Sequence, residues 1–158
     1  MKSILFICFI IFLAPSFAQC DTIPLLNKEI TNLVGLKINK KVGTGECWDL
    51  AKFALDEVDA KWDGGLVYGR KLSATECIYP GDIIQFEKIK IKYKKGKQIF
   101  TEAMPHHTAI VYKVLTQDEI TLIHQNTGYS GRKVGTSSLK FSTIISGKYY
   151  IYRPEKKI

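Results

Sequence analysis

Cys47 is the residue of this sequence whose surroundings best suit a reactive thiol. It follows the glycine-rich turn of "VGTGECWDLAKFAL", residues 42–55, and precedes apolar residues at helical spacing. Unpaired N–H groups at a helix N-terminus stabilise a thiolate, so a cysteine placed there can become a nucleophile. It also needs a base within hydrogen-bond distance and a third group that orients the base. The alternatives for Cys47 are a core cysteine and one half of a disulfide.

The candidate bases lie in the second half of the chain. There are three histidines: His106, His107 and His124. The stretches 107–114 and 119–126 have strand-like patterns and are joined by the polar turn "TQDE", which pairs them antiparallel. Strand alternation then places His107 opposite His124 or Asn126, while His106 points away. A histidine held through one nitrogen by an amide oxygen is what a cysteine–histidine pair requires.

The elements that must position these side chains follow from the spacing of apolar residues. One helix is predicted from Pro24 to about Leu36, and a second from Cys47 to Val58, with Asp49 on its mostly exposed side. Strands are then predicted over 82–86, 88–100 (a hairpin turning at 95–96), 107–115, 119–126, 133–141 and 147–154. Helices followed by five or six mostly antiparallel strands indicate an α+β fold.

Lysines alternate with apolar residues in the hairpin "KIKIKYKKGKQIF", and the chain carries a formal net charge of +8. A basic surface attracts polyanions such as cell-wall polymers, although solubility alone explains it equally well. For the hairpin we favour the second of two interpretations, a polyanion site or an edge that uses lysine to prevent aggregation. No nucleic-acid-binding motif is recognisable.

The N-terminus has the layout of a secretory signal peptide. Lys2 precedes an apolar run from Ile4 to Ala14, and small residues follow up to a cleavage site after Ala18. We therefore expect residues 1–18 to be a signal peptide, residues 19–158 to be a single domain, and the protein to be secreted or periplasmic. An uncleaved N-terminal anchor and a lipidated Cys20 are the alternatives. No other segment is predicted to cross a membrane.

Signal cleavage removes Cys8 and leaves three cysteines: Cys20, Cys47 and Cys77. In an oxidising compartment one internal disulfide can form among them, and one thiol stays free. Three pairings are open, of which only Cys20–Cys77 leaves Cys47 as a thiol. The sequence does not choose among them.

Several motifs together resemble papain-like hydrolases of the CHAP and NlpC/P60 groups. They are the cysteine at a helix start, "GDIIQF", "HTAIV" and a strand ending in "HQN". The chain is also similar to a smaller papain-fold family, found in plants and bacteria and at the C-terminus of some fungal actin-patch proteins. That likeness adds "GTGECWDLA" and "IYRP" and extends over residues 43–154.

The resemblance implies a cysteine-bearing helix packed on an antiparallel sheet, with Cys47 as nucleophile and His107 as base. Asn126 or His124 would orient the base, and Asn126 is the slightly favoured site member. The implied activity is amide-bond hydrolysis, with peptide or peptidoglycan-like substrates, anionic cell-wall polymer as a further partner and no cofactor. Two departures stand out: Glu46 precedes the cysteine where CHAP domains often have glutamine, and His124 replaces an acid.

Two other interpretations of these residues stay open. A catalytically inert binding or adaptor domain would keep the same side chains without turnover. A zinc site could use Cys47, His107 and His124, but the tight paired spacing typical of such sites is absent. We therefore expect no metal.

Overall fold

The computed structural model of the chain describes residue 20 and residues 22–157, so the predicted signal peptide, residues 1–18, lies outside the described residues. Helices come first and strands follow, as the sequence predicts. The elements are α1 (Leu25–Gly35), α2 (Asp49–Glu57), β1 (Ala60–Lys61), β2 (Arg70–Lys71), β3 (Ile83–Lys95), β4 (Gln98–Val114), β5 (Glu119–His124), β6 (Gly135–Lys140), β7 (Ile144–Arg153) and β8 (Glu155–Lys156), with a short 3-10 helix at Phe141–Thr143.

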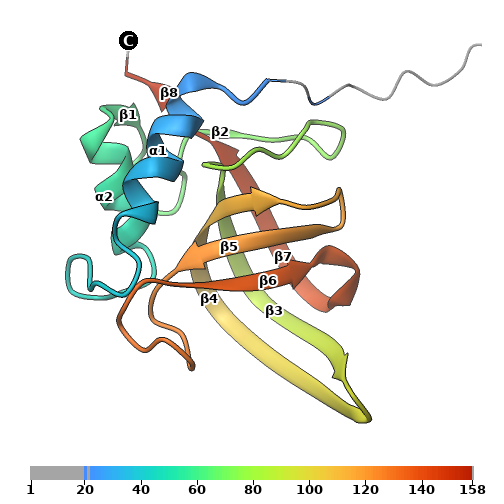
Figure 1. Cartoon of the computed structure of the whole chain (residues 1–158). Coiled ribbons are helices and arrows are strands. Elements are labelled where there is room, and N and C mark those ends of the chain that lie inside the picture. Colours follow the sequence, from blue (N-terminus) through green and yellow to red (C-terminus); the bar gives the residue numbers. More distant parts are fainter. Residues whose placement is uncertain (1–19, 21, 158) are drawn as a thin grey trace, which may run out of the picture.

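Six of these strands form one antiparallel sheet in the order β2-β7-β3-β4-β5-β6, and β1 pairs with β8. Both helices lie on the same side of the sheet (Figure 1). The sheet has an apolar core on each face because successive side chains of a strand point in opposite directions. Ile83 belongs to the core under the helices, and Ile84 belongs to the core on the other face. Within the described part of the chain, no helix is long and apolar enough to span a bilayer.

The helix that follows Cys47 begins later than predicted. Cys47 and Trp48 form a turn, and α2 begins at Asp49, so the expectation of Cys47 inside the first helical turn is wrong. The expected exposure of Asp49 is also wrong, since this residue is 6% exposed. Its carboxylate folds back onto the preceding loop and accepts hydrogen bonds from the backbone N–H groups of Gly45 and Glu46 and from the Thr44 hydroxyl. These hydrogen bonds hold the loop against the start of α2, where the sequence predicted a further helical turn.

Strands β3 and β4 form a hairpin longer than either predicted strand (Figure 1). Its turn lies at residues 96–97, between the paired Lys95 and Gln98, one residue later than the predicted 95–96. Lys88 has a positive φ of 52° and lies opposite Pro105, which has no N–H to donate to the ladder. The alternation of side chains in β3 shifts by one residue there. Phe86 and Ile89, three positions apart, therefore both belong to the core on the face away from the helices. Because of this shift, the apolar side chains of β3 beyond Lys88 point to the same face of the sheet as Phe86.

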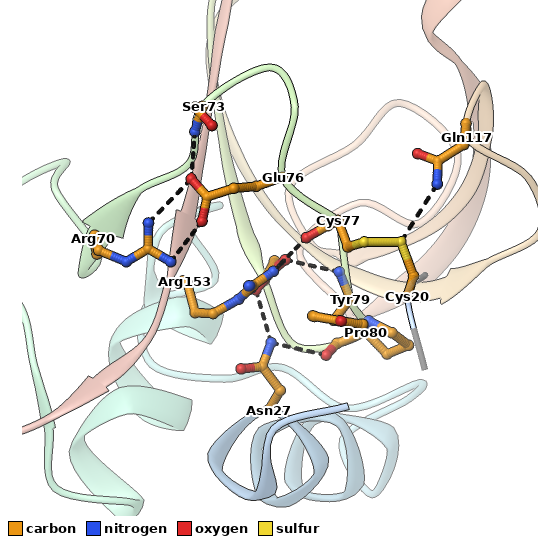
Figure 2. Close-up of polar contacts among 11 residues, drawn as sticks. Cys20, Asn27, Arg70, Ser73, Glu76, Cys77, Tyr79, Pro80, Gln117 and Arg153 are labelled. Carbon is orange, nitrogen blue, oxygen red and sulfur yellow. Dashed lines mark hydrogen bonds and ion pairs between the residues drawn. A yellow bond between two sulfur atoms is a disulfide. The ribbon is translucent and has the colours of Figure 1, made fainter. Parts of the chain in front are cut away.

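The start of β3 is fastened by a buried ion pair (Figure 2). The Asp82 carboxylate is fully buried and accepts hydrogen bonds from the Arg153 guanidinium, at 2.8 and 3.1 Å, and from the Asn27 amide at 2.8 Å. Arg153 also donates to the carbonyl of Cys77, which forms a disulfide with Cys20. The cluster joins α1, the loop before β3 and the end of β7. Asp82 is therefore a structural strand-start residue, as the sequence predicts.

Candidate active site

A large cavity opens on the face of the sheet away from the helices. Its volume is about 1190 Å³, and its lining includes Cys47, His107, His124 and Asn126. The four candidate residues, separated by up to 79 positions in sequence, are thus brought to one cavity. The disulfide between Cys20 and Cys77 leaves Cys47 as a half-buried free thiol.

His107 and His124 are in direct contact at the floor of this site. Nε2 of His107 lies 2.7 Å from Nδ1 of His124, and the two residues are 6% and 5% exposed. One ring donates and the other accepts, because a neutral imidazole has one N–H and one bare nitrogen. This contact occupies Nε2 of His107 and leaves Nδ1 as the nitrogen that can accept a thiol proton.

The second ring is held in turn by two hydroxyl groups. Nε2 of His124 lies 2.9 Å from the Tyr129 hydroxyl and 2.9 Å from the Ser137 hydroxyl. When the His124 proton is on Nε2, that N–H donates to one of these oxygens and Nδ1 accepts from His107. This tautomer is the one in which Nδ1 of His107 carries no proton. The two hydroxyls and two rings therefore form a chain that can set His107 up as a base.

The electrostatics of the pair differ from those of a histidine beside a carboxylate. Burial lowers the pKa of His107 to about 4. Burial, with a smaller contribution from His107, lowers the pKa of His124 to about 3. Both rings are therefore neutral at pH 7, and no hydrogen bond within residues 20 and 22–157 joins either ring to a carboxylate that would stabilise an imidazolium.

The residue that follows His124 fixes the loop that carries the cysteine. Gln125 is fully buried, accepts a hydrogen bond from the N–H of Val42 and donates to the carbonyls of Val42 and Glu46. Sequence analysis gave Gln125 no role. The signal that marks Gln125 is its burial, and burial is not readable from sequence.

Asn126 contacts Glu46 rather than either histidine. Strand β5 ends at His124, and Asn126 has a positive φ of 60°, so the alternation that would aim it at His107 no longer applies. Its amide donates to the Glu46 carboxylate at 2.9 Å, and Arg132 pairs with the same carboxylate at 3.2 Å. The negative charge before Cys47 is thus matched by a guanidinium.

The N–H of Cys47 is among the backbone donors around the thiol that have no acceptor in the described part of the chain. Asp49 takes the N–H groups of Gly45 and Glu46, whereas the N–H of Cys47 has no acceptor among residues 20 and 22–157. In the same residues, no hydrogen bond joins the Cys47 sulfur to a histidine ring, and no cluster of three or more histidine, cysteine or acidic side chains is grouped as a metal site requires.

A buried polar network lies beside His107 on the opposite face of β4. The Tyr68 hydroxyl lies 3.0 Å from the Thr108 hydroxyl, which donates to the Gln85 amide oxygen at 2.7 Å. Burial raises the pKa of Tyr68 to about 12, so this hydroxyl keeps its proton. Because Thr108 follows His107 directly, the network fixes β4 at the histidine. Sequence analysis did not identify Tyr68.

A thiol and a histidine pair at one cavity, on a sheet with a helix that starts beside the thiol, define a papain-like cysteine proteinase-fold domain. The chain belongs to the AIM3/BBC1 cysteine proteinase-fold domain family, whose model matches residues 26–157. This confirms the predicted papain-like fold and the expected likeness to the smaller family.

Relatives support the same assignment. Altered inheritance of mitochondria protein 3 from Debaryomyces hansenii is 28% identical over 137 residues, which cover 75% of this chain and 15% of that protein. The crystal structure of Ly7917 superposes with a TM-score of 0.52 at 18% identity, covering 80% of this chain and 62% of Ly7917. A second structure, Ly7917 with the hydrolyzing product of MDP, gives a TM-score of 0.51 at 18% identity, covering 81% and 62%. At this identity the likeness to Ly7917 shows the fold alone.

Proposed function

We propose that this protein is a cysteine hydrolase that cleaves amide bonds, with Cys47 as nucleophile, His107 as general base and His124 as the residue that positions the base. The observation that carries the proposal is the 2.7 Å contact between Nε2 of His107 and Nδ1 of His124. It fixes the ring and reserves Nδ1 for the thiol that lines the same cavity.

The reaction has two halves. Nδ1 of His107 takes the Cys47 proton while the sulfur bonds to the substrate carbonyl carbon, and the N–H of Cys47 donates to the resulting oxyanion. His107 then returns the proton to the leaving amine as the C–N bond breaks, which leaves a thioester. Water attacks the thioester, gives its proton to His107 and releases the carboxylic acid and the thiol.

The low pKa of His107 determines how the base would operate. With a pKa of about 4, the ring is neutral at pH 7, so the thiol and imidazole form no standing ion pair. The ring instead removes the proton as the sulfur attacks. The acid limb of kcat/KM should then lie near pH 4 rather than near pH 6.5, because protonation of His107 is what abolishes the base.

Peptides of a cell wall are the proposed substrate class, and secretion is the proposed location. The resemblance of the motifs to CHAP and NlpC/P60 hydrolases supports this choice, as do the signal-like first 18 residues and the net charge of +8.

An inert binding domain is the second candidate. It is favoured by one feature of the site: among the described residues no carboxylate is hydrogen-bonded to either ring, so the imidazolium formed during turnover lacks a counter-charge there. In the relative altered inheritance of mitochondria protein 3, the matching region is also a small part of a much longer protein.

Activity on peptidoglycan fragments, measured by mass spectrometry of the released peptides, tests the choice between the two. Cys47→Ala and His107→Ala should abolish cleavage while the variants keep the circular dichroism of the wild type. His124→Ala should lower kcat/KM about 100-fold, whereas His124→Asn, which keeps an amide oxygen for His107, should recover part of that loss. Unchanged cleavage in Cys47→Ala, or no cleavage by the wild type on any peptide fragment, would refute the hydrolase.

A further inference from the structure

The cavity continues from the histidine pair along an unpaired strand edge. β5 pairs with β4 only from Ile110 to Val114, so among the described residues the β4 edge from Gln98 to His107 has no strand partner on that side. Residues 102–107 of this edge line the cavity, together with residues 126–129 and 137–140, which follow β5 and form β6. The hairpin that carries this edge projects away from the helices (Figure 1).

The unpaired edge can bind a peptide backbone. An edge strand presents alternating N–H and C=O groups, and an extended peptide that pairs with them becomes an additional strand. The edge leads directly to His107, so a peptide seated on it would reach the thiol with its own backbone aligned. Polysaccharides and polyphosphates cannot form such a ladder of amide hydrogen bonds.

The charges that line the cavity are mainly positive. Lys92, Lys94 and Lys140 are the lysines in the lining, and Glu102 is its single acidic residue. Strand alternation places Lys92 and Lys94 on the face of the hairpin opposite Ile91 and Tyr93, so they lie at the rim of the cavity, where every second side chain of a peptide paired with β4 would point. The Glu102 carboxylate already accepts a hydrogen bond from the Tyr93 hydroxyl at 2.6 Å. Lys140 pairs with Glu119, whereas no ion pair is recorded for Lys92 or Lys94 within the part of the chain that the structure describes. The uncompensated charge lies on the same hairpin as the unpaired edge.

From these two features we infer that the cavity binds an extended acidic peptide, which pairs with the β4 edge while Lys92 and Lys94 bind its carboxylates. This inference rests on the proposed function and specifies its substrate class. It also revises the sequence interpretation of the hairpin lysines: two of them line a binding groove rather than only protecting an edge. The groove distinguishes acidic from basic peptides by charge and peptides from other polyanions by hydrogen bonding.

A binding assay on the Cys47→Ala protein tests the inference without any need for turnover. The probe is a fluorescein-labelled peptide of about eight residues in which glutamate alternates with threonine, and matched peptides carry glutamine or lysine. By fluorescence polarisation, Lys92→Glu/Lys94→Glu should weaken binding of the acidic peptide about tenfold, since each exposed charge pair is worth a fraction of a kcal/mol and reversal doubles its effect. Lys28→Glu/Lys61→Glu changes the net charge equally outside the cavity and should leave binding within about twofold.

The edge is tested with N-methylated versions of the acidic peptide. Methylation of alternate amides that face β4 should abolish binding, whereas methylation of the other set should not. Equal binding of polyphosphate and of both methylated peptides would overturn the inference in favour of a nonspecific polyanion surface. Equal binding of the acidic, glutamine and lysine peptides would also overturn it. If the acidic peptide binds as expected but the wild-type protein cleaves no peptide, the inference holds and the hydrolase fails.

Discussion

This domain contains two buried polar clusters that differ in whether their charges are compensated. At the start of β3, the Asp82 carboxylate and the Arg153 guanidinium neutralise each other, and the Asn27 amide and Arg153 donate to this carboxylate and to the Cys77 carbonyl. At the cavity, the hydrogen-bond partners of His107 and His124 within the described chain are each other and two hydroxyls, and none of them is charged. The first arrangement joins elements, and the second keeps proton-accepting groups available.

The difference indicates how to separate function from stability in this fold. A buried ion pair stabilises mainly in the sense that removing one partner is very costly. A buried pair of neutral bases contributes little to stability and costs free energy as soon as it is protonated. Burial alone would rank both clusters as structural, whereas the absence of compensation, together with a cavity, singles out the second.

Asp82→Ala should have the largest effect on stability. It leaves the Arg153 guanidinium, whose side chain is 15% exposed, without its carboxylate, and should lower the free energy of unfolding by about 3–5 kcal/mol. Urea denaturation followed by circular dichroism measures it. Lys52→Ala removes one partner of the exposed pair with Asp56 and serves as the control, with an expected change within about 1 kcal/mol. An equal, small change in the free energy of unfolding for both variants would show that the buried pair does not stabilise the domain.

Acid should destabilise the domain through the histidine pair. The folded-state pKa values of about 4 for His107 and about 3 for His124 lie below the unfolded value of 6.5, so the unfolded chain binds more protons as the pH falls. Stability is therefore complete above about pH 6.5 and is lost as the pH falls towards those folded values. At pH 4.5 we expect a loss of about 2 kcal/mol for each histidine.

Urea titrations at several pH values measure this loss. The double variant His107→Gln/His124→Gln should show a much flatter dependence between pH 6.5 and 5.5, a range that lies above the ordinary pKa values of Asp and Glu carboxyls. A wild-type protein whose stability does not change over this range would mean that the rings are solvated rather than buried.

Gln125→Ala should detach the loop before Cys47. It removes three hydrogen bonds to the backbone of Val42 and Glu46 and leaves buried groups without partners, at a cost of about 1–3 kcal/mol. The informative measurement is local: amide hydrogen exchange should increase over residues 42–47 more than in β3. Thr136→Ala, on the neighbouring strand β6, is the matched control. Uniform exchange across the domain would contradict a local role for Gln125.

Glu46→Gln should have the smallest effect. It removes a carboxylate that pairs with Arg132, whose side chain is 62% exposed, so stability should change by less than about 1 kcal/mol. The rate of Cys47 alkylation by iodoacetamide should rise about two- to threefold, because a negative charge next to the thiol is removed. Glu57→Gln, at the far end of α2, should leave the rate unchanged. A slower reaction in Glu46→Gln would show that the loop has lost its shape.

Much of this arrangement is readable from the sequence because it depends on local patterns. Helix α1 and the strand starting near Asp82 follow from apolar spacing, and the hairpin turn at residues 96–97 lies within one residue of its predicted position. The meeting of Cys47 and His107 at one cavity follows from the order of motifs. In each case the signal lies within a short window or in a whole-chain likeness.

The features that sequence analysis missed depend on backbone geometry at the ends of elements. The alternation rule fails at Asn126 because its positive φ takes it out of β5. The helix begins at Asp49 because the Asp49 carboxylate finds donors in a loop that first has to fold back. The role of Gln125 depends on a contact with Val42, 83 positions away. No local pattern encodes any of these three.

The disulfide between Cys20 and Cys77 has a consequence for how the thiol survives oxidation. The two half-cystines lie 57 positions apart and enclose Cys47 within the loop that they close. Once they are joined, the chain holds no second thiol among residues 20 and 22–157 with which Cys47 could react. An internal disulfide at Cys47 needs a second cysteine, so the Cys20–Cys77 pairing occupies the two described cysteines that could otherwise have blocked this thiol. A chain that paired wrongly during maturation would fold around a blocked sulfur.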